Sequence, residues 1–63
     1  MKKILRFKFA VVTIKQLNIT RLPYFITATS RKDAYIKLII DIYENLEENE
    51  VLDRIEFISE YEL

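Results

Sequence analysis

The chain has no cysteine and no histidine among its 63 residues, which removes two common means of stabilising so small a fold. A chain of this size buries only about 60% of its unfolded surface, so a lone apolar core is marginal. Below roughly 70–80 residues, disulfides, a metal ion or oligomerisation usually supply the missing stability. Disulfides and the usual zinc sites are excluded here. An unusually apolar core or self-association remains, and the 51% hydrophobic content suits either.

The same absences limit the chemistry that the chain can perform. Without histidine and cysteine it lacks the commonest general base, the commonest thiol nucleophile and most transition-metal ligands. Glycine is absent too, which excludes a glycine-rich phosphate loop. We therefore expect a protein that is not an enzyme and that needs neither a cofactor nor a metal.

The first residues do not predict a targeting segment. Lys2 and Lys3 resemble the charged start of a signal peptide, but Arg6 and Lys8 interrupt the apolar stretch and no small-residue cleavage site follows. No run approaches 18 apolar residues, so we expect no membrane span. These features predict a cytoplasmic protein.

Residues 3–14 alternate at period two, which predicts a strand with one buried face. Arg6 and Lys8 belong to the outward set. The inward set is apolar: Leu5, Phe7, Phe9 and Val11. Beyond Phe9 the outward set also becomes apolar, with Ala10, Val12 and Ile14. We expect either a covering element or a bulge that shifts the register there.

Residues 15–23 are predicted to form a turn region, followed by a second strand over residues 24–29. In the absence of glycine, Asn18 is the best candidate for a residue with positive φ. Pro23 cannot donate to a strand ladder, which places it at a strand start or on a sheet edge.

Ser30, with Asp33 three residues later, matches a helix-capping pattern and predicts a helix over about residues 31–47. A third strand is expected from Val51. Its predicted inward set is Ile55, Phe57, Tyr61 and Leu63. Its predicted outward set is Glu56, Ile58, Glu60 and Glu62.

These elements predict a single α+β domain over residues 1–63, in the order strand, strand, helix, strand. We expect a three-stranded, mainly antiparallel sheet with one helix packed on one face. A right-handed crossover would place the third strand beside the first; the third strand beside the second is the alternative.

The passage Tyr24-Phe-Ile-Thr-Ala-Thr-Ser-Arg-Lys-Asp-Ala34 resembles a segment frequent in small strand-strand-helix-strand proteins. It combines an alternating strand, a serine cap, an acid and an alanine facing the sheet. The richness in isoleucine, lysine, glutamate and asparagine, together with the short chain, is similar to small phage and mobile-element proteins of low-G+C bacteria. This resemblance implies a host protein as partner but assigns no functional residue.

Opposite charges occupy the two parts of the chain. Residues 1–40 hold nine bases and one acid, and residues 41–63 hold nine acids and one base. Cross-strand pairs of Arg6 and Lys8 with Glu56, Glu60 or Glu62 would explain part of this polarity. Five of the other bases form a candidate basic patch: Lys2, Lys3, Arg21, Arg31 and Lys32. Six acids form a candidate acidic patch, and Glu56 is considered in both roles: Asp41, Glu44, Glu47, Glu48, Glu50 and Glu56.

The predicted helix is too apolar for contact with one sheet alone, since its apolar residues cover an arc of about 240°. One possibility is that the loop at residues 15–22 covers the surplus. The favoured hypothesis is a homodimer interface. Its candidate residues are Ile36, Ile40 and Tyr43 on the helix, with Val12 and Ile14 on the first strand.

Three functions fit these features. The favoured one is a small homodimeric protein that binds and modulates or inhibits a host or defence protein. A nucleic-acid-binding regulator would use the basic patch, with Phe25 as a stacking platform. A structural or assembly accessory protein would stack through its opposite charges.

Overall fold

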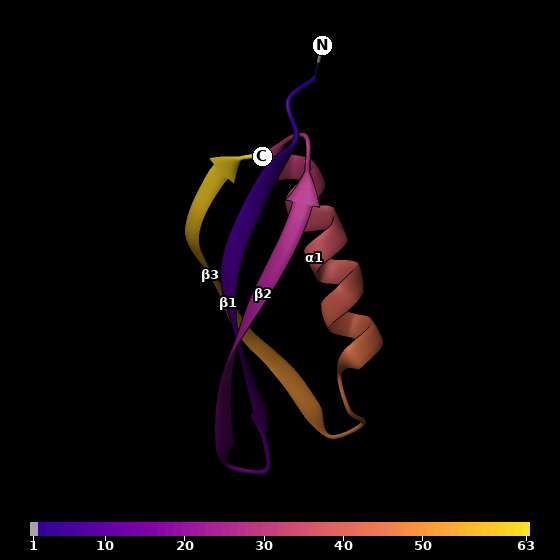
Figure 1. The fold of residues 1–63 in the computed structure, drawn as a ribbon. Helices are drawn as coiled ribbons and strands as arrows, with labels where there is room; N and C mark the ends of the chain where they lie inside the picture. Colours follow the sequence, from indigo (N-terminus) through magenta and orange to yellow (C-terminus); the bar gives the residue numbers. More distant parts are fainter. Residues whose placement is uncertain (1) are drawn as a thin grey trace.

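The computed structural model describes residues 2–63, which form three strands and one helix (Figure 1). β1 spans Leu5–Lys15, β2 spans Asn18–Ala28, α1 spans Arg31–Asn45 and β3 spans Glu50–Glu62. The order of the elements confirms the predicted α+β fold.

β1 is the central strand of the sheet, whose order is β2-β1-β3. Both neighbours run antiparallel to β1, so β2 and β3 run in the same direction on either side of it. The chain passes from β2 through α1 to β3, which confirms the predicted position of the third strand beside the first. The β1–β2 hairpin extends beyond the end of α1, and the molecule is elongated, with extents of 46 × 19 × 13 Å (Figure 1).

The core lies between α1 and one face of the sheet, called here the inner face. Residues four positions apart on α1 share one side of the helix and meet alternate residues of β1. Helix and sheet contribute together to one buried cluster: Phe7, Phe9, Val11, Ile26, Ala28, Ala34, Leu38 and Ile42.

α1 begins where the sequence predicts. Ser30 has extended backbone angles, and its side chain accepts a hydrogen bond from the backbone N–H of Asp33 at 3.2 Å. This satisfies one of the free donors of the first turn. The helix ends at Asn45, slightly earlier than predicted, and Leu46 continues in an extended conformation.

The turn between β1 and β2 differs from the prediction. It contains only Gln16 and Leu17, which both have positive φ, at 49° and 65°. Two central residues with positive φ match a type I′ hairpin turn, whose twist suits the flanking strands. Asn18, predicted to have positive φ, is instead the first residue of β2. The strand therefore starts six residues before the predicted Tyr24 and includes Pro23, on an edge strand as expected.

β3 carries two irregularities in its pairing with β1. Its 13 residues, Glu50–Glu62, face the 11 residues Leu5–Lys15, so two residues of β3 have no partner: Asp53 and Ile58. Each extra residue is a β-bulge and exchanges the two faces of the strand beyond it.

The second bulge overturns part of the predicted alternation. Phe57 opposes Phe9 and faces inward, as expected. Beyond Ile58, however, Glu60 opposes Phe7 on the inner face, and Tyr61 opposes Arg6 on the outer face. The predictions that Tyr61 points inward and that Glu60 and Glu62 point outward were therefore wrong.

Candidate protein-binding surfaces

α1 has two apolar faces, and the sheet covers only one. Its inner face is buried along Ala34, Leu38 and Ile42. The opposite face carries residues at spacing i, i+3, i+4 and i+7, which lie in line along a helix. We call this set the outer stripe: Ile36, Ile39, Ile40 and Tyr43.

The outer stripe is open to solvent. Ile36, Ile40 and Tyr43 are 49%, 55% and 62% exposed, and Ile39 is 38% exposed. Residues 15–22, considered as a cover for this surface, form the last residue of β1, the turn and the start of β2 instead, so that alternative was wrong. Ile39 was not among the predicted interface residues, although its spacing from Ile36 and Tyr43 could have identified it.

The outer face of the sheet has a different cover. Ala10 and Val12, on β1, are each 1% exposed although no helix lies over them. Val12 is flanked by Arg21 of β2 and Arg54 of β3, and Ala10 is flanked by Glu56 of β3. The aliphatic stems of such side chains can cover apolar neighbours while their charged ends meet above.

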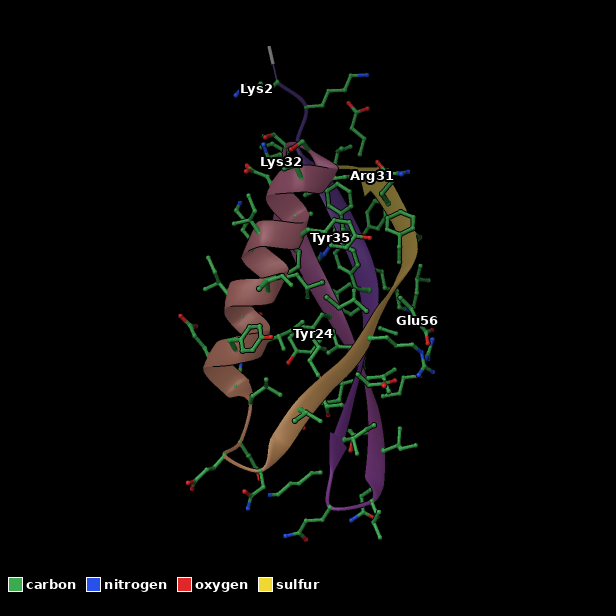
Figure 2. All side chains as sticks on the ribbon, turned by 180° about the vertical axis from the view of Figure 1, so that it is seen from behind. Lys2, Tyr24, Arg31, Lys32, Tyr35 and Glu56 are labelled. Carbon is green, nitrogen blue, oxygen red and sulfur yellow. The ribbon has the colours of Figure 1, made fainter. Side chains whose placement is uncertain are left out.

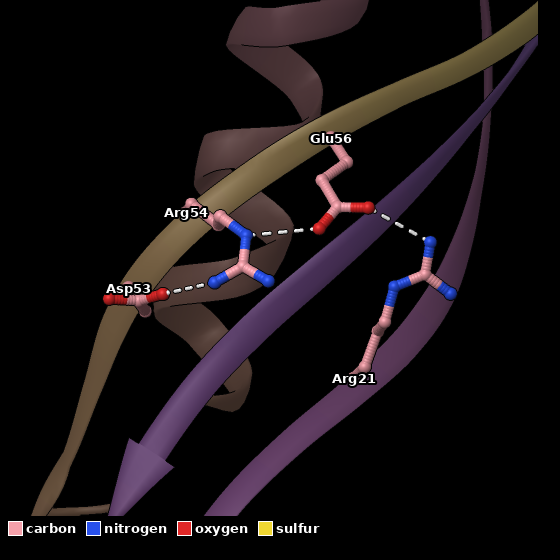
Figure 3. Close-up of polar contacts among 4 residues, drawn as sticks. All are labelled: Arg21, Asp53, Arg54 and Glu56. Atoms are coloured by element: carbon pink, nitrogen blue, oxygen red, sulfur yellow. Dashed lines mark hydrogen bonds and ion pairs between the residues drawn. The ribbon is translucent and has the colours of Figure 1, made fainter.

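Those charged ends form an ion-pair bridge across β1, defined as Arg21, Glu56 and Arg54 (Figure 3). The guanidinium of Arg21 donates to Glu56 at 2.9 Å, and that of Arg54 donates to the other carboxylate oxygen at 3.0 Å. Hydrogen bonds from Arg21, then from Arg54, hold the pKa of Glu56 below its usual 4.5. The bridge therefore favours the ionised carboxylate.

This cover changes the candidate interface on β1. Val12 lies beneath the ion-pair bridge and offers no surface to a partner. Ile14 lies beyond the bridge, half-buried between Ile19 and Val51, which are 70% and 59% exposed. We call these three residues the tip row. Leu17, in the adjoining turn, is fully exposed.

The predicted basic patch is largely neutralised. Three of its five members form ion pairs with the last strand: Lys3 with Glu62, Arg21 with Glu56, and Arg31 with Glu60, at 3.6, 2.9 and 2.6 Å. Lys2 and Lys32 are exposed, at the same end of the molecule as Arg31 (Figure 2). These pairs account for much of the charge polarity of the sequence.

The predicted acidic patch divides between two places. Glu44, Glu47, Glu48 and Glu50 follow each other through the end of α1 into the start of β3, with Asp41 one turn earlier. Glu56 lies apart from them, in the ion-pair bridge on the outer face of the sheet. Within the first group Glu47 pairs with Lys15, and Glu50 accepts a hydrogen bond from Thr13 at 2.6 Å.

Arg6 and Lys8 do not form the cross-strand pairs expected of them. Both lie near the ring of Phe25 on the outer face, at 5.5 and 5.8 Å from its centroid. Among residues 2–63 neither forms an ion pair. Tyr61 opposes Arg6 on the same face and is half exposed. The second bulge brings this tyrosine to the outer face, and the alternation of the sequence does not reveal it.

The concave surfaces are shallow or small. An open groove of about 320 Å³ lies between β2 and α1, where Lys37 donates to the backbone carbonyl of Thr27 at 3.0 Å. A second hollow of about 210 Å³ lies under the end of α1, beside Tyr24. Burial, and then the charges of Asp41 and Glu50, raise the pKa of this tyrosine. A phenol with a raised pKa remains protonated and is a poor general base.

Tyr35 shows how α1 also reaches β3. It points from the helix toward the sheet (Figure 2), and its ring centroid lies 5.1 Å from that of Phe9. The ring of Phe57 on β3 meets the same Phe9 ring edge to face, with 5.9 Å between the two ring centroids. Arg31 lies 4.8 Å above the ring of Phe57. Tyr35 therefore packs against the aromatic side chains of the sheet and has a structural role.

Within residues 2–63 no cluster of three or more acidic, histidine or cysteine side chains is placed to hold a metal. The part of the chain that the structure describes contains no helix with the length and apolarity to cross a membrane. Comparisons of the chain with protein-family models, with curated proteins and with solved structures find no match. The case for function therefore depends on the surfaces themselves.

Proposed function

We propose that this chain is a non-enzymatic protein-binding domain that works in the cytoplasm as a homodimer and modulates a second protein by covering part of its surface. The observation that carries the proposal is the outer stripe of α1. Four large apolar side chains, 38% to 62% exposed, lie in line on the side of the helix that the sheet does not cover.

The energetics of a small fold support a partner for this stripe. Burying an isoleucine side chain contributes about 1.5–3 kcal/mol, and the isolated chain forgoes roughly half of this at Ile36 and Ile40, which are 49% and 55% exposed. The i, i+3, i+4, i+7 spacing is the one through which amphipathic helices pack on each other. A second copy of the chain is the simplest partner with a matching stripe.

Dimerisation through α1 leaves the outer face of the sheet free for a different protein. The tip row of Ile14, Ile19 and Val51 lies there, next to the fully exposed Leu17. We propose that this apolar end contacts the modulated protein. The similarity of the sequence to phage and mobile-element proteins suggests a host protein in that role.

The test is the mass of the protein in solution, measured by light scattering or sedimentation over a range of concentrations. We expect a dimer for the unmodified chain and a folded monomer for the double variant Ile36→Glu/Ile40→Glu. Ile19→Glu is the matched control, because it adds one acid at an exposed isoleucine outside the stripe, and it should remain dimeric. A monomeric unmodified protein, or a double variant that stays dimeric, would reject the proposal.

A second candidate function has one specific observation in its favour. Arg6 and Lys8 are unpaired within the described chain and lie beside Phe25, with Tyr61 on the same open sheet face. Cations next to exposed aromatic rings suit single-stranded nucleic acid. Labelled oligonucleotides should then bind with an affinity that falls steeply with salt, and Arg6→Glu/Lys8→Glu should abolish binding. The ion pairs of Lys3, Arg21 and Arg31 reduce the charge available for this function.

A further inference from the structure

The charges at the two ends of α1 oppose the direction of its own dipole. A helix favours acids near its N-terminus and bases near its C-terminus. In α1 the first turn contains Arg31 and Lys32 beside a single acid, Asp33, and the last turn contains no base. Glu44 lies near the C-terminal end, and Glu48 follows in the loop.

Part of this arrangement has a role within the chain. Arg31 pairs with Glu60, and the backbone of Asp33 takes part in the cap with Ser30. Lys32, Glu44 and Glu48 are exposed and form no ion pair within residues 2–63. They therefore contribute no ion pair to the isolated fold.

From this charge pattern we infer that the outer stripe pairs with the α1 helix of a second copy in antiparallel orientation. This inference rests on the homodimer proposed above and specifies its geometry. An antiparallel pair places the end that carries Lys32 against the end that carries Glu44 and Glu48 of the second copy. It also places the positive end of each helix dipole beside the negative end of the other.

The parallel alternative is unfavourable for the same reasons. It would bring the C-terminal ends of both helices together, with Glu44 and Glu48 from each copy and two negative dipole ends. Like charges at close range destabilise a contact. The apolar stripe permits both orientations, and the end charges select one.

The fold allows the antiparallel contact without rearrangement. The outer stripe faces away from the sheet, so two copies meet helix to helix and form four layers in the order sheet, helix, helix, sheet. A two-fold axis between Ile39 and Ile40 pairs Ile36 with Tyr43 of the second copy. The contact covers about two helical turns and is smaller than a standard interface of about 800 Å² per partner. We therefore expect a dimer whose population depends on protein concentration.

A charge-reversal cycle tests the orientation. In the antiparallel dimer, Lys32→Glu places an acid near Glu44 of the second copy, and Glu44→Lys places two bases together. Each single variant should weaken dimerisation roughly threefold to tenfold, because the dimer contains every contact twice. The double variant Lys32→Glu/Glu44→Lys should recover most of the affinity. A parallel dimer keeps like charges opposite each other in all variants and would show no such coupling.

A distance measurement provides a second test that does not depend on affinity. The chain has no cysteine, so Asp33→Cys creates one site for a spin label. In the antiparallel dimer the two labelled positions lie about 20 Å apart along the helix axes, from a rise of 1.5 Å per residue. In a parallel dimer only the interaxial spacing of about 8–10 Å separates them.

The outcomes separate this inference from the proposed function. A short label distance, or an absence of coupling between Lys32→Glu and Glu44→Lys, would overturn the antiparallel geometry. The homodimer itself would still stand if Ile36→Glu/Ile40→Glu dissociates it. A protein that is monomeric at all concentrations would overturn both. Coupling together with the longer label distance would support the inference.

Discussion

The two faces of α1 show what the same kind of side chain does in different surroundings. On the inner face Leu38 is fully buried against the sheet. About 100° around the helix, Ile39 is 38% exposed and belongs to the outer stripe. Both residues are large and aliphatic, and they are adjacent in sequence. The inner face is fully buried in the folded chain, whereas the outer stripe is only partly covered and would be buried further only by an additional contact.

The largest expected effect is the difference between Leu38→Ala and Ile39→Ala. Leu38→Ala removes a fully buried side chain and should cost about 2–5 kcal/mol of unfolding free energy. Ile39→Ala should cost less than Leu38→Ala at low protein concentration, because part of the Ile39 side chain is already exposed. Urea denaturation at low protein concentration measures both. Equal losses for the two variants would show that the outer stripe already contributes to the fold of the monomer.

In the β1–β2 turn an exposed apolar residue lowers the stability of the native chain, and replacing it should raise the unfolding free energy. Leu17 is fully exposed in a left-handed conformation that is unfavourable for a residue with a Cβ atom. Replacing Gln16 and Leu17 with asparagine and glycine should raise the unfolding free energy by about 1–2 kcal/mol, because these residues suit a type I′ turn. The midpoint of urea denaturation should rise. A lower midpoint would contradict the conformational argument.

The dependence of the melting temperature on protein concentration is a smaller effect that distinguishes the outer stripe from the inner face. If the outer stripe is buried in a dimer, the melting temperature of the unmodified chain rises with protein concentration. Each tenfold increase above the dissociation constant should add about 0.7 kcal/mol per chain, equivalent to roughly 3–5 °C for a domain of this size. Ile36→Glu/Ile40→Glu should melt at one temperature throughout. Calorimetry at several concentrations provides the measurement.

The smallest expected effect concerns the outer face of the sheet, which has charged side chains as its cover. The pKa of Glu56 is below its usual value in the folded chain, so its ionised form contributes stability above that usual value. This contribution is lost as the pH falls through the lowered pKa. Glu56→Gln should therefore reduce stability slightly at pH 7 and reduce the decline in stability as the pH falls below the usual 4.5. Denaturation curves across this range would reveal an unchanged decline if the bridge contributes nothing.

Much of the fold could be predicted because its local signals agree. The alternation of β1, the Ser30 cap and the long apolar helix each define one element, and the handedness of crossovers gives the strand order. The start of β2 was missed because Gln16 and Leu17 are unusual turn residues and gave no signal. The bulge at Ile58 was missed because an isoleucine fits either face of a strand.

The candidate surfaces were less predictable, for a related reason. Arg21 and Arg31 were assigned to a basic patch because their partners, Glu56 and Glu60, are 35 and 29 residues away in sequence. Only the register of the sheet brings Arg21 close to Glu56. Val12 was assigned to an interface because a charged cover is not visible in an apolar pattern. The helix residues Ile36, Ile40 and Tyr43 could be identified because helical periodicity alone determines their common side.

The two sheet edges have a consequence for the kind of assembly that this chain can form. An open strand edge can recruit another strand repeatedly and grow into a filament. Bulges at Asp53 and Ile58 interrupt one edge, and the other contains Pro23 and has its Thr27 carbonyl occupied by Lys37. Polymerisation by strand addition is therefore impeded at both sides. A two-fold contact between helices is self-limiting and ends at two copies, so the molecule can be strongly apolar and still avoid unlimited growth.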